Sequence, residues 1–330
     1  MKKKKLLIGE TVENLLKGNR RAAARLISVI EDDSDKAQEA MKLIYPHSGQ
    51  AMILGITGSG GAGKSSLTDQ LIRIFRRQEK TVGVVVVDPS SPFSGGALLG
   101  DRIRLTKHSL DDGVYIRSLA SRGYLGGLSR ATNDVIRVME AMGKDLVIVE
   151  TLGAGQDEID VIHIAQTCLL VVTPAMGDDI QAMKAGIMEI ADIIVVNKAD
   201  LDGATTCLRN LEAALSVKRF EKEEWVPKLV KTVAVASKEE DIEGIEDLVS
   251  IIAEHQAHLH ETRAINRLRF ERIEQELSLI FKDEVEKAVF KGLKGTGKKR
   301  EYVNSIIKGD NDPYSVVDEV LNSYLQSSQS

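Results

Sequence analysis

Short apolar, β-branched runs alternate with helical segments through the middle of this 330-residue chain. Runs such as 84–87 and 146–149 are continuously apolar, as strands are when helices cover both faces of a sheet. Because a parallel connection needs a crossover, repeated strand–helix–strand units predict an α/β protein with a doubly wound, mostly parallel sheet. About seven strands are expected, at residues 51–57, 81–87, 114–118, 145–150, 168–173, 192–196 and 229–235.

Helical segments flank this central region. Apolar residues at helical spacing across 10–45 predict two short helices, and charged residues surround one apolar stripe across 268–285. A last helix is expected at about 314–325, after a Gly- and Lys-rich stretch at 292–300 that we interpret as a linker. The predicted organisation is a helical extension at 1–48, an α/β domain at 49–260 and a helical region at 261–330 that could serve as a dimerisation arm.

Charge and composition exclude several classes of partner. Lys and Arg total 44 against 49 Asp and Glu, a formal net charge of −5, so nucleic acid is not an expected partner. The apolar part of the N-terminus stops at Glu10, too early for an export signal, and nothing approaches the length of a membrane span. With only Cys168 and Cys207, the chain suits a reducing compartment, and we expect a cytoplasmic protein without membrane contact.

A glycine-rich loop directly follows the first expected strand. Gly58, Gly63, Lys64 and Ser65 satisfy G-x-x-x-x-G-K-[ST], in which backbone N–H groups wrap phosphate, the lysine faces the β- and γ-phosphates and the hydroxyl binds Mg²⁺. The loop also satisfies the dinucleotide pattern G-x-G-x-x-G, with Asp88 at the end of the second strand as a ribose carboxylate. A dinucleotide, however, has no γ-phosphate for the lysine and hydroxyl. The expected phosphate-binding residues are Gly58, Gly60, Gly61, Ala62, Gly63, Lys64, Ser65 and Ser66.

An N-K-x-D sequence, Asn197 to Asp200, ends the sixth expected strand. A carboxylate at Asp200 can accept hydrogen bonds from both N1–H and the 2-amino group of guanine, whereas adenine offers no such pair. A four-residue motif is weak alone and becomes strong on an apolar strand downstream of a phosphate loop. Asn197, Lys198 and Asp200 are therefore expected to read guanine, and Ser237 after the seventh strand is a weaker candidate.

Oxygen ligands at strand ends suit Mg²⁺, which usually keeps phosphate oxygens and waters around one or two protein carboxylates. The candidates are Ser65, Asp88, Asp101, Glu150 and Thr151. For Asp101, which precedes two nearby arginines, a surface ion pair that opens a helix is the alternative interpretation.

The expected catalytic residues are Lys64, Asp101, Glu150, Gln156 and Lys184. Gln156 lies in a glycine-flanked loop of the kind that can sense a γ-phosphate, and Lys184 ends a loop beyond the fifth strand that a partner could order. The D-x-x-G-Q arrangement that positions water in Ras-like GTPases does not occur, so we expect slow intrinsic hydrolysis.

Together these motifs resemble the MeaB/ArgK family of GTPases. The resemblance covers nearly the whole chain: residues 16–22, the loop at 58–66, the long stretch 88–104, then 150–156, 177–181 and 197–200. It implies that 49–260 is a P-loop GTPase domain with Mg²⁺ and bound GTP or GDP, that Arg104 contacts nucleotide, and that 177–184 is a switch loop. It also implies a homodimer that gates adenosylcobalamin loading and protection of an acyl-CoA mutase, with a cobalamin adenosyltransferase as a further partner.

The chain departs from the family pattern at three places. Gly60 and Gly61 stand where the family loop often has proline, closer to the GTPase domain of isobutyryl-CoA mutase-type enzymes, and Leu152 and Ala154 replace the usual valines. The cobalamin signature D-x-H-x-x-G does not occur, so the chain itself is not expected to bind cobalamin.

Three other functions share parts of this pattern. A nickel-insertion GTPase would need Cys/His clusters that the scattered cysteines and histidines do not supply. A kinase or transport-associated NTPase would use the same P-loop and yield a phosphorylated product. A dinucleotide oxidoreductase would transfer hydride, and Lys64, Ser65 and the N-K-x-D sequence argue against it.

Overall fold

The computed structural model describes residues 7–32, 35–89, 105–121, 130–151, 161–176, 191–217, 220–221, 223–235, 238–293 and 297–327. The chain divides into two compact units, Met1–Arg269 and Phe270–Ser330, and each is described by itself.

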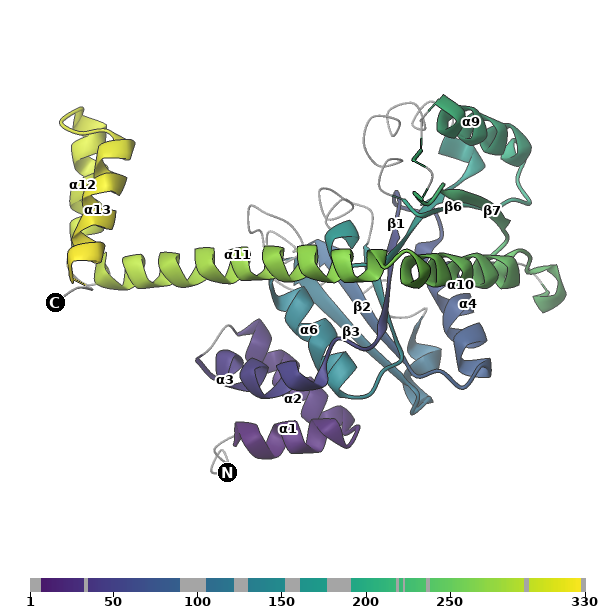
Figure 1. Ribbon diagram of the computed structural model, residues 1–330, viewed down its shortest axis with the longest axis horizontal. Helices are drawn as coiled ribbons and strands as arrows, with labels where there is room; N and C mark the ends of the chain where they lie inside the picture. Colours follow the sequence, from purple (N-terminus) through teal and green to yellow (C-terminus); the bar gives the residue numbers. More distant parts are fainter. Residues whose placement is uncertain are drawn as a thin grey trace. The chain divides into compact units, whose positions relative to one another are not determined.

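Unit 1 is built on a seven-stranded parallel sheet with the order β3-β2-β4-β1-β5-β6-β7 (Figure 1). All seven expected strands are confirmed, with ends shifted by at most three residues. The strands are β1 (Met52–Thr57), β2 (Val82–Pro89), β3 (Val114–Ser121), β4 (Leu146–Thr151), β5 (Thr167–Val172), β6 (Ile193–Asn197) and β7 (Lys228–Thr232).

Helices cover both faces of the sheet, which explains its continuously apolar strands. Successive residues of a strand point to opposite faces, so Ile53 belongs to one apolar cluster and Leu54 to another. Helices α4 (Lys64–Arg77) and α10 (Ile245–Glu261) pack on the Leu54 side. On the opposite side lie α6 (Arg130–Ala141) and α9 (Ala204–Val217). The doubly wound α/β fold is thus confirmed.

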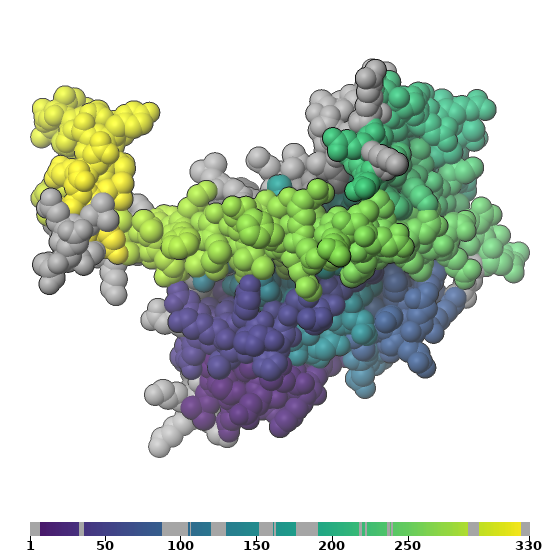
Figure 2. Space-filling view, in the orientation of Figure 1, coloured from purple at the N-terminus to yellow at the C-terminus, as the bar shows by residue number. Residues whose placement is uncertain are grey.

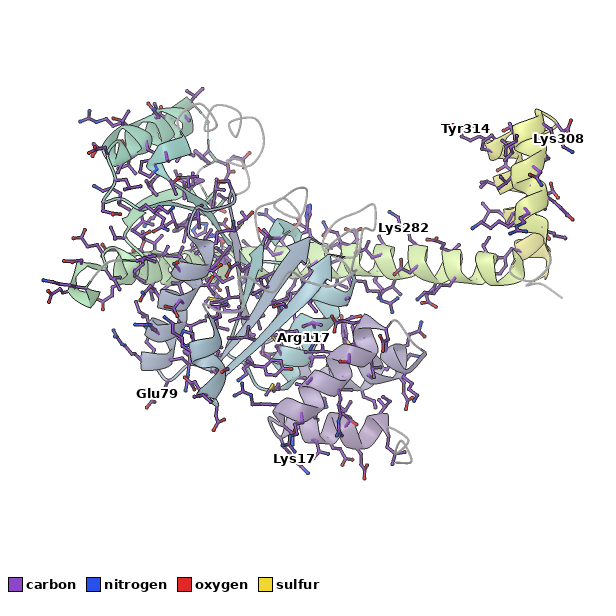
Figure 3. The ribbon with its side chains drawn as sticks, turned by 180° about the vertical axis from the view of Figure 1, so that it is seen from behind. Lys17, Glu79, Arg117, Lys282, Lys308 and Tyr314 are labelled. Atoms are coloured by element: carbon purple, nitrogen blue, oxygen red, sulfur yellow. The ribbon has the colours of Figure 1, made fainter. Side chains whose placement is uncertain are left out.

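Three N-terminal helices, rather than the expected two, pack on α6: α1 (Ile8–Leu16), α2 (Arg20–Glu31) and α3 (Asp35–Ile44). The prediction missed the break at Gly18, which has φ +79°, and Asn19, whose side chain accepts the N–H groups of Arg21 and Ala22 and so begins α2. Figure 2 shows these helices as one continuous purple body. Arg117 of β3, labelled in Figure 3, forms an ion pair with Glu31 of α2.

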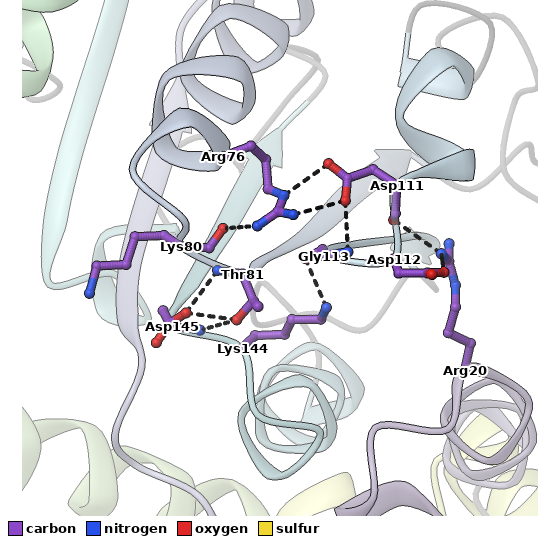
Figure 4. Close-up of polar contacts among 9 residues, drawn as sticks. All are labelled: Arg20, Arg76, Lys80, Thr81, Asp111, Asp112, Gly113, Lys144 and Asp145. Atoms are coloured by element: carbon purple, nitrogen blue, oxygen red, sulfur yellow. Dashed lines mark hydrogen bonds and ion pairs between the residues drawn. The ribbon is translucent and has the colours of Figure 1, made fainter.

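A polar network ties α2 and α4 to the amino-terminal end of the sheet (Figure 4). The Arg76 guanidinium donates two hydrogen bonds to Asp111, at 2.9 and 3.0 Å, and Arg20 donates to the Asp111 carbonyl at 3.1 Å. Lys144 Nζ donates to the Gly113 carbonyl at 2.9 Å, and burial lowers the pKa of Lys144 to about 8. The network fixes the helical extension to the sheet at the end opposite the carboxyl termini of the strands.

The remaining helices follow α10. They are α11 (Ala264–Leu293), which begins in unit 1, and α12 (Lys298–Lys308) and α13 (Pro313–Ser327) of unit 2. The last helix is found as expected, and Asp312 caps it by accepting the N–H groups of Tyr314 and Ser315. The expected linker at 292–300 is wrong at both ends, because α11 continues to Leu293 and α12 begins at Lys298.

Five short 3₁₀ turns complete the elements of the described residues: η1 (Tyr45–His47), η2 (Thr106–Leu110), η3 (Val161–His163), η4 (Pro174–Met176) and η6 (Glu239–Asp241). Over the ranges given above, no helix is both long enough and apolar enough to cross a membrane.

Candidate functional site

The glycine-rich loop lies at the centre of the sheet edge. It joins β1 to α4, and β1 stands between β4 and β5, where the direction of strand addition reverses. In open α/β sheets ligands bind outside the carboxyl ends of the strands at such a point. Glu150 and Thr151 end β4 and Asn197 ends β6, so the topology brings the expected phosphate, metal and base residues to one edge.

Two glycines of the loop are required by its geometry. Gly58 has φ +134°, and a Cβ there would lie 2.1 Å from the Val171 carbonyl oxygen. Gly63 has φ +94°, and its Cβ would lie 2.2 Å from Nδ2 of Asn197. Gly61 also has a positive φ, +77°, but faces open space. The loop therefore packs closely on β5 and β6 at its two ends.

Lys64 begins α4 and is 5% exposed. Its ammonium group donates to the carbonyl oxygens of Gly58, at 2.5 Å, and Ser59, at 2.9 Å. These bonds hold a buried cation against the loop whose N–H groups can wrap phosphate. Ser66, the next residue but one, is half-buried on the same first helical turn.

The Glu150 carboxylate is the centre of a buried hydrogen-bond cluster. The Ser65 hydroxyl donates to Oε1 at 2.5 Å, and the Thr68 hydroxyl donates to Oε2 at 2.7 Å. Glu150 and Thr68 are both 0% exposed. Thr151, also on β4, donates to the Thr57 hydroxyl at 3.3 Å. The sequence prediction missed Thr68, although its place three residues after Ser65 puts both side chains on one helical face.

These side chains suit a magnesium ion. Ser65, Glu150 and Thr151 offer only hydroxyl and carboxylate oxygens, the donors that Mg²⁺ prefers. The described ranges hold no group of three His, Cys, Asp or Glu side chains able to bind a metal. Asp88 lies near the end of β2, directly after Val87, which pairs with Thr151 of β4. The side chain of Asp88 is not among those that the structure describes.

Asn197 connects the loop to the base-side strands. Its Nδ2 donates to the Ala62 carbonyl at 2.8 Å, and its Oδ1 accepts from the Thr232 hydroxyl at 3.1 Å and from Ala234 N at 3.2 Å. The carboxamide therefore positions the phosphate loop relative to β7. Nothing in the N-K-x-D pattern alone points to these partners.

Lys198 and Asp200 lie in the turn after β6. Lys198 adopts the left-handed conformation, with φ +58°, and both side chains are exposed on the edge that carries the loop. They are thus available to a ligand. The expected site residues Asp101, Arg104, Gln156, Lys184 and Ser237 lie outside the described residues.

Asp69 joins α4 to η2, the turn that follows residues 90–104 in the chain. It is 6% exposed and accepts hydrogen bonds from Lys107 Nζ and His108 Nε2, both at 2.6 Å, while Arg73 lies 3.5 Å away. Burial alone would raise the pKa of Asp69, but the bonds from His108 and Lys107 outweigh it and hold the pKa below its ordinary value.

Comparison with known proteins agrees with this architecture. A protein of Pyrococcus horikoshii named as a GTPase is 48% identical over 316 residues, covering 95% of this chain and 97% of its own. The GTPase ArgK of Escherichia coli is 32% identical over 269 residues, covering 79% and 80%. A crystal structure of an LAO/AO transport system kinase, 24% identical, covers 98% of each chain with a TM-score of 0.69 and supports the fold alone.

The family model for "Methylmalonyl Co-A mutase-associated GTPase MeaB" matches residues 23–294, most of the chain. The match includes the phosphate loop, Glu150 and the N-K-x-D turn, which the fold places on one edge of the sheet. The chain therefore belongs to the MeaB family of P-loop GTPases.

Proposed function

We propose that this protein binds GTP with Mg²⁺, hydrolyses it slowly, and uses its nucleotide state to gate adenosylcobalamin loading and protection of an acyl-CoA mutase. The main support is a set of hydrogen bonds at one edge of the sheet. The Ser65 hydroxyl donates to Glu150, and the Asn197 side chain donates to the phosphate loop. The family name supports the mutase as partner. A cytoplasmic location and contact with a cobalamin adenosyltransferase belong to the same proposal, as does the absence of cobalamin binding by this chain.

The residues of the edge divide the work on the nucleotide. The loop N–H groups and the Lys64 ammonium bind the β- and γ-phosphates. To do so, Lys64 exchanges its hydrogen bonds to the Gly58 and Ser59 carbonyl oxygens for bonds to phosphate oxygens. Ser65 and Glu150 form the part of the site that would hold Mg²⁺, and the bound ion would neutralise phosphate charge. Asp200 accepts the two guanine donors, and Asn197 keeps the loop in register with that turn.

The partner-dependent part of the proposal involves Asp101, Gln156 and Lys184. In this part, a docked mutase orders the loop at 177–184. The charge of the transition state is then stabilised through Lys184, or by repositioning of Asp101 and Glu150 around Mg²⁺. This accounts for slow turnover without a partner.

GTP hydrolysis with and without the cognate mutase tests the proposal. We expect the mutase to accelerate hydrolysis by the parent and Lys64→Ala to abolish tight GTP binding while the sheet stays folded. Stimulation absent in the parent would overturn the chaperone role, and unchanged turnover by Lys64→Ala would overturn the P-loop assignment.

Base selectivity is tested at Asp200. Asp200→Asn should shift preference from GTP toward XTP, because an amide can donate to the xanthine 2-oxo group where the carboxylate only accepts. Competition binding with GTP, XTP and ATP measures the shift. If variant and parent rank the three nucleotides alike, Asp200 does not read the base.

Phosphoryl transfer to a protein is the second candidate, because the structural neighbour is described as a transport system kinase. Incubation with γ-labelled GTP and a candidate transport protein as phosphate acceptor distinguishes the two functions. Label released as free phosphate supports the GTPase, whereas label retained on protein supports the kinase.

A further inference from the structure

Thr68 stands out among the residues around the phosphate loop, because its polar group is buried and committed to one partner. It lies on α4 with 0% exposure, and its hydroxyl donates to Glu150 Oε2 at 2.7 Å. A threonine hydroxyl inside a helix commonly bonds the carbonyl four residues back instead. Since a hydroxyl carries a single proton, the bond to Glu150 uses the donor of Thr68 completely.

Thr68 and Ser65 hold the two oxygens of one carboxylate. Ser65 Oγ lies 2.5 Å from Oε1, so each oxygen of Glu150 has its own hydroxyl from the same face of α4. The terminal torsion of a glutamate is broad and has no sharply preferred staggered state. Without Thr68 the carboxylate plane could turn, and Oε1 would leave the Ser65 hydroxyl.

The orientation of Glu150 matters for the ion that Ser65 is proposed to ligate. A hydroxyl that ligates a cation still needs an acceptor for its proton, and Glu150 Oε1 is already in that position. Groups that orient a metal ligand in this way change metal affinity by roughly 10- to 100-fold when removed.

We propose that Thr68 is a positioning residue of the magnesium site: it holds Glu150 Oε2, keeps Oε1 on the Ser65 hydroxyl, and thereby tightens Mg²⁺ binding beside the nucleotide. The inference rests on the proposed GTPase function. It assigns Thr68 no contact with nucleotide, so nucleotide affinity without Mg²⁺ should not depend on it.

The test is a Mg²⁺ titration of the release of a fluorescent GDP analogue from the full-length protein. Thr68→Val keeps the shape and removes the hydroxyl, and it should raise the Mg²⁺ concentration for half-maximal slowing of release roughly 10-fold. Thr68→Ser, which retains the hydroxyl, should titrate like the parent. Affinity for the analogue in EDTA should be equal in all variants.

Thr167→Val is the matched control. Thr167 is also 0% exposed and hydrogen-bonded, but it begins β5 at the opposite end of the sheet. It should titrate like the parent. An equal shift in Thr167→Val would mean a general loss of stability and would overturn the inference.

The remaining outcomes separate this inference from the function on which it rests. A parent that binds the analogue with Mg²⁺ dependence, together with a Thr68→Val that titrates identically, overturns the role of Thr68 alone. A parent that does not bind GDP overturns both. Circular dichroism verifies folding, and if valine is not tolerated, Thr68→Ala replaces it, with equal titration by the alanine and serine variants as the contradicting result.

Discussion

At the scale of single residues, Asp69 shows how burial and pairing compete. Its carboxylate is nearly inaccessible, yet hydrogen bonds from His108 and Lys107 keep it ionised with a pKa below the ordinary 3.8. Because the folded state binds the proton more weakly than the unfolded state, Asp69 stabilises the fold fully above about pH 4. That contribution is lost as pH falls through the lowered pKa.

Asp69→Asn should therefore destabilise the protein by about 2 kcal/mol at pH 7, since two charge-assisted hydrogen bonds are weakened. The difference from the parent should shrink as pH falls below about 4 and through the lowered pKa of Asp69, because the parent carboxylate is then protonated as well. Chemical denaturation at pH 7 and at pH 3 measures it. Asp112→Asn is the control, because Asp112 is fully exposed with Arg20 at 3.8 Å, and a surface pair contributes little. A pH-independent difference would contradict the assignment.

At the scale of elements, the phosphate loop is held by contact with neighbouring strands at both ends. Gly58 lies against the β5 backbone and Gly63 against the Asn197 side chain, which itself bonds β7 partners. The shape of the loop therefore depends on β5, β6 and β7 together, and a change at one of these contacts should alter the affinity for nucleotide.

Gly58→Ala should cost about 3 kcal/mol of stability and abolish tight nucleotide binding, because a side chain there meets both a left-handed φ and the Val171 carbonyl. Gly61→Ala is the matched change, since its φ is also positive but nothing lies within 4 Å of the added Cβ. It should cost only about 1 kcal/mol. Thermal unfolding and GDP titration measure both, and equal losses in the two variants would show that φ alone, and not strand contact, sets the cost.

At the scale of the whole molecule, α11 carries a stripe of exposed apolar side chains. Phe270, Ile273, Leu277, Phe281 and Val285 recur at helical spacing, and each is at least 41% exposed. Exposed apolar side chains at this spacing on a helix are typical of a surface that packs against another segment or another chain. We propose that a second copy of this chain covers it, which makes 261–330 a dimerisation arm.

Light scattering at micromolar concentration should give twice the chain mass of 36.1 kDa. Leu277→Glu should shift the protein toward monomer, because burial of a carboxylate in an apolar contact is costly. Gln275→Glu, at an exposed position away from the stripe, should leave the mass unchanged. A monomeric parent would contradict the dimer.

Much of the fold could be predicted from the sequence because its signals are local. Strand positions follow from short apolar runs, and parallel order follows from the helices between them. The phosphate loop and the N-K-x-D turn are contiguous, so their residue types and spacing carry the chemistry without knowledge of neighbours. The extra helix break at Gly18 and Asn19 was also local, and apolar periodicity concealed it.

Tertiary structure decided which side chains meet. Thr68 and Glu150 are 82 residues apart and Asn197 and Ala62 are 135 apart, so no periodicity or motif links either pair. Their contacts arise because parallel strands bring their carboxyl ends to one edge, where the helix after β1 begins. The sequence thus determined the residue types available for phosphate, metal and base, whereas only the chain path determined that a threonine orients the carboxylate and that an asparagine braces the loop.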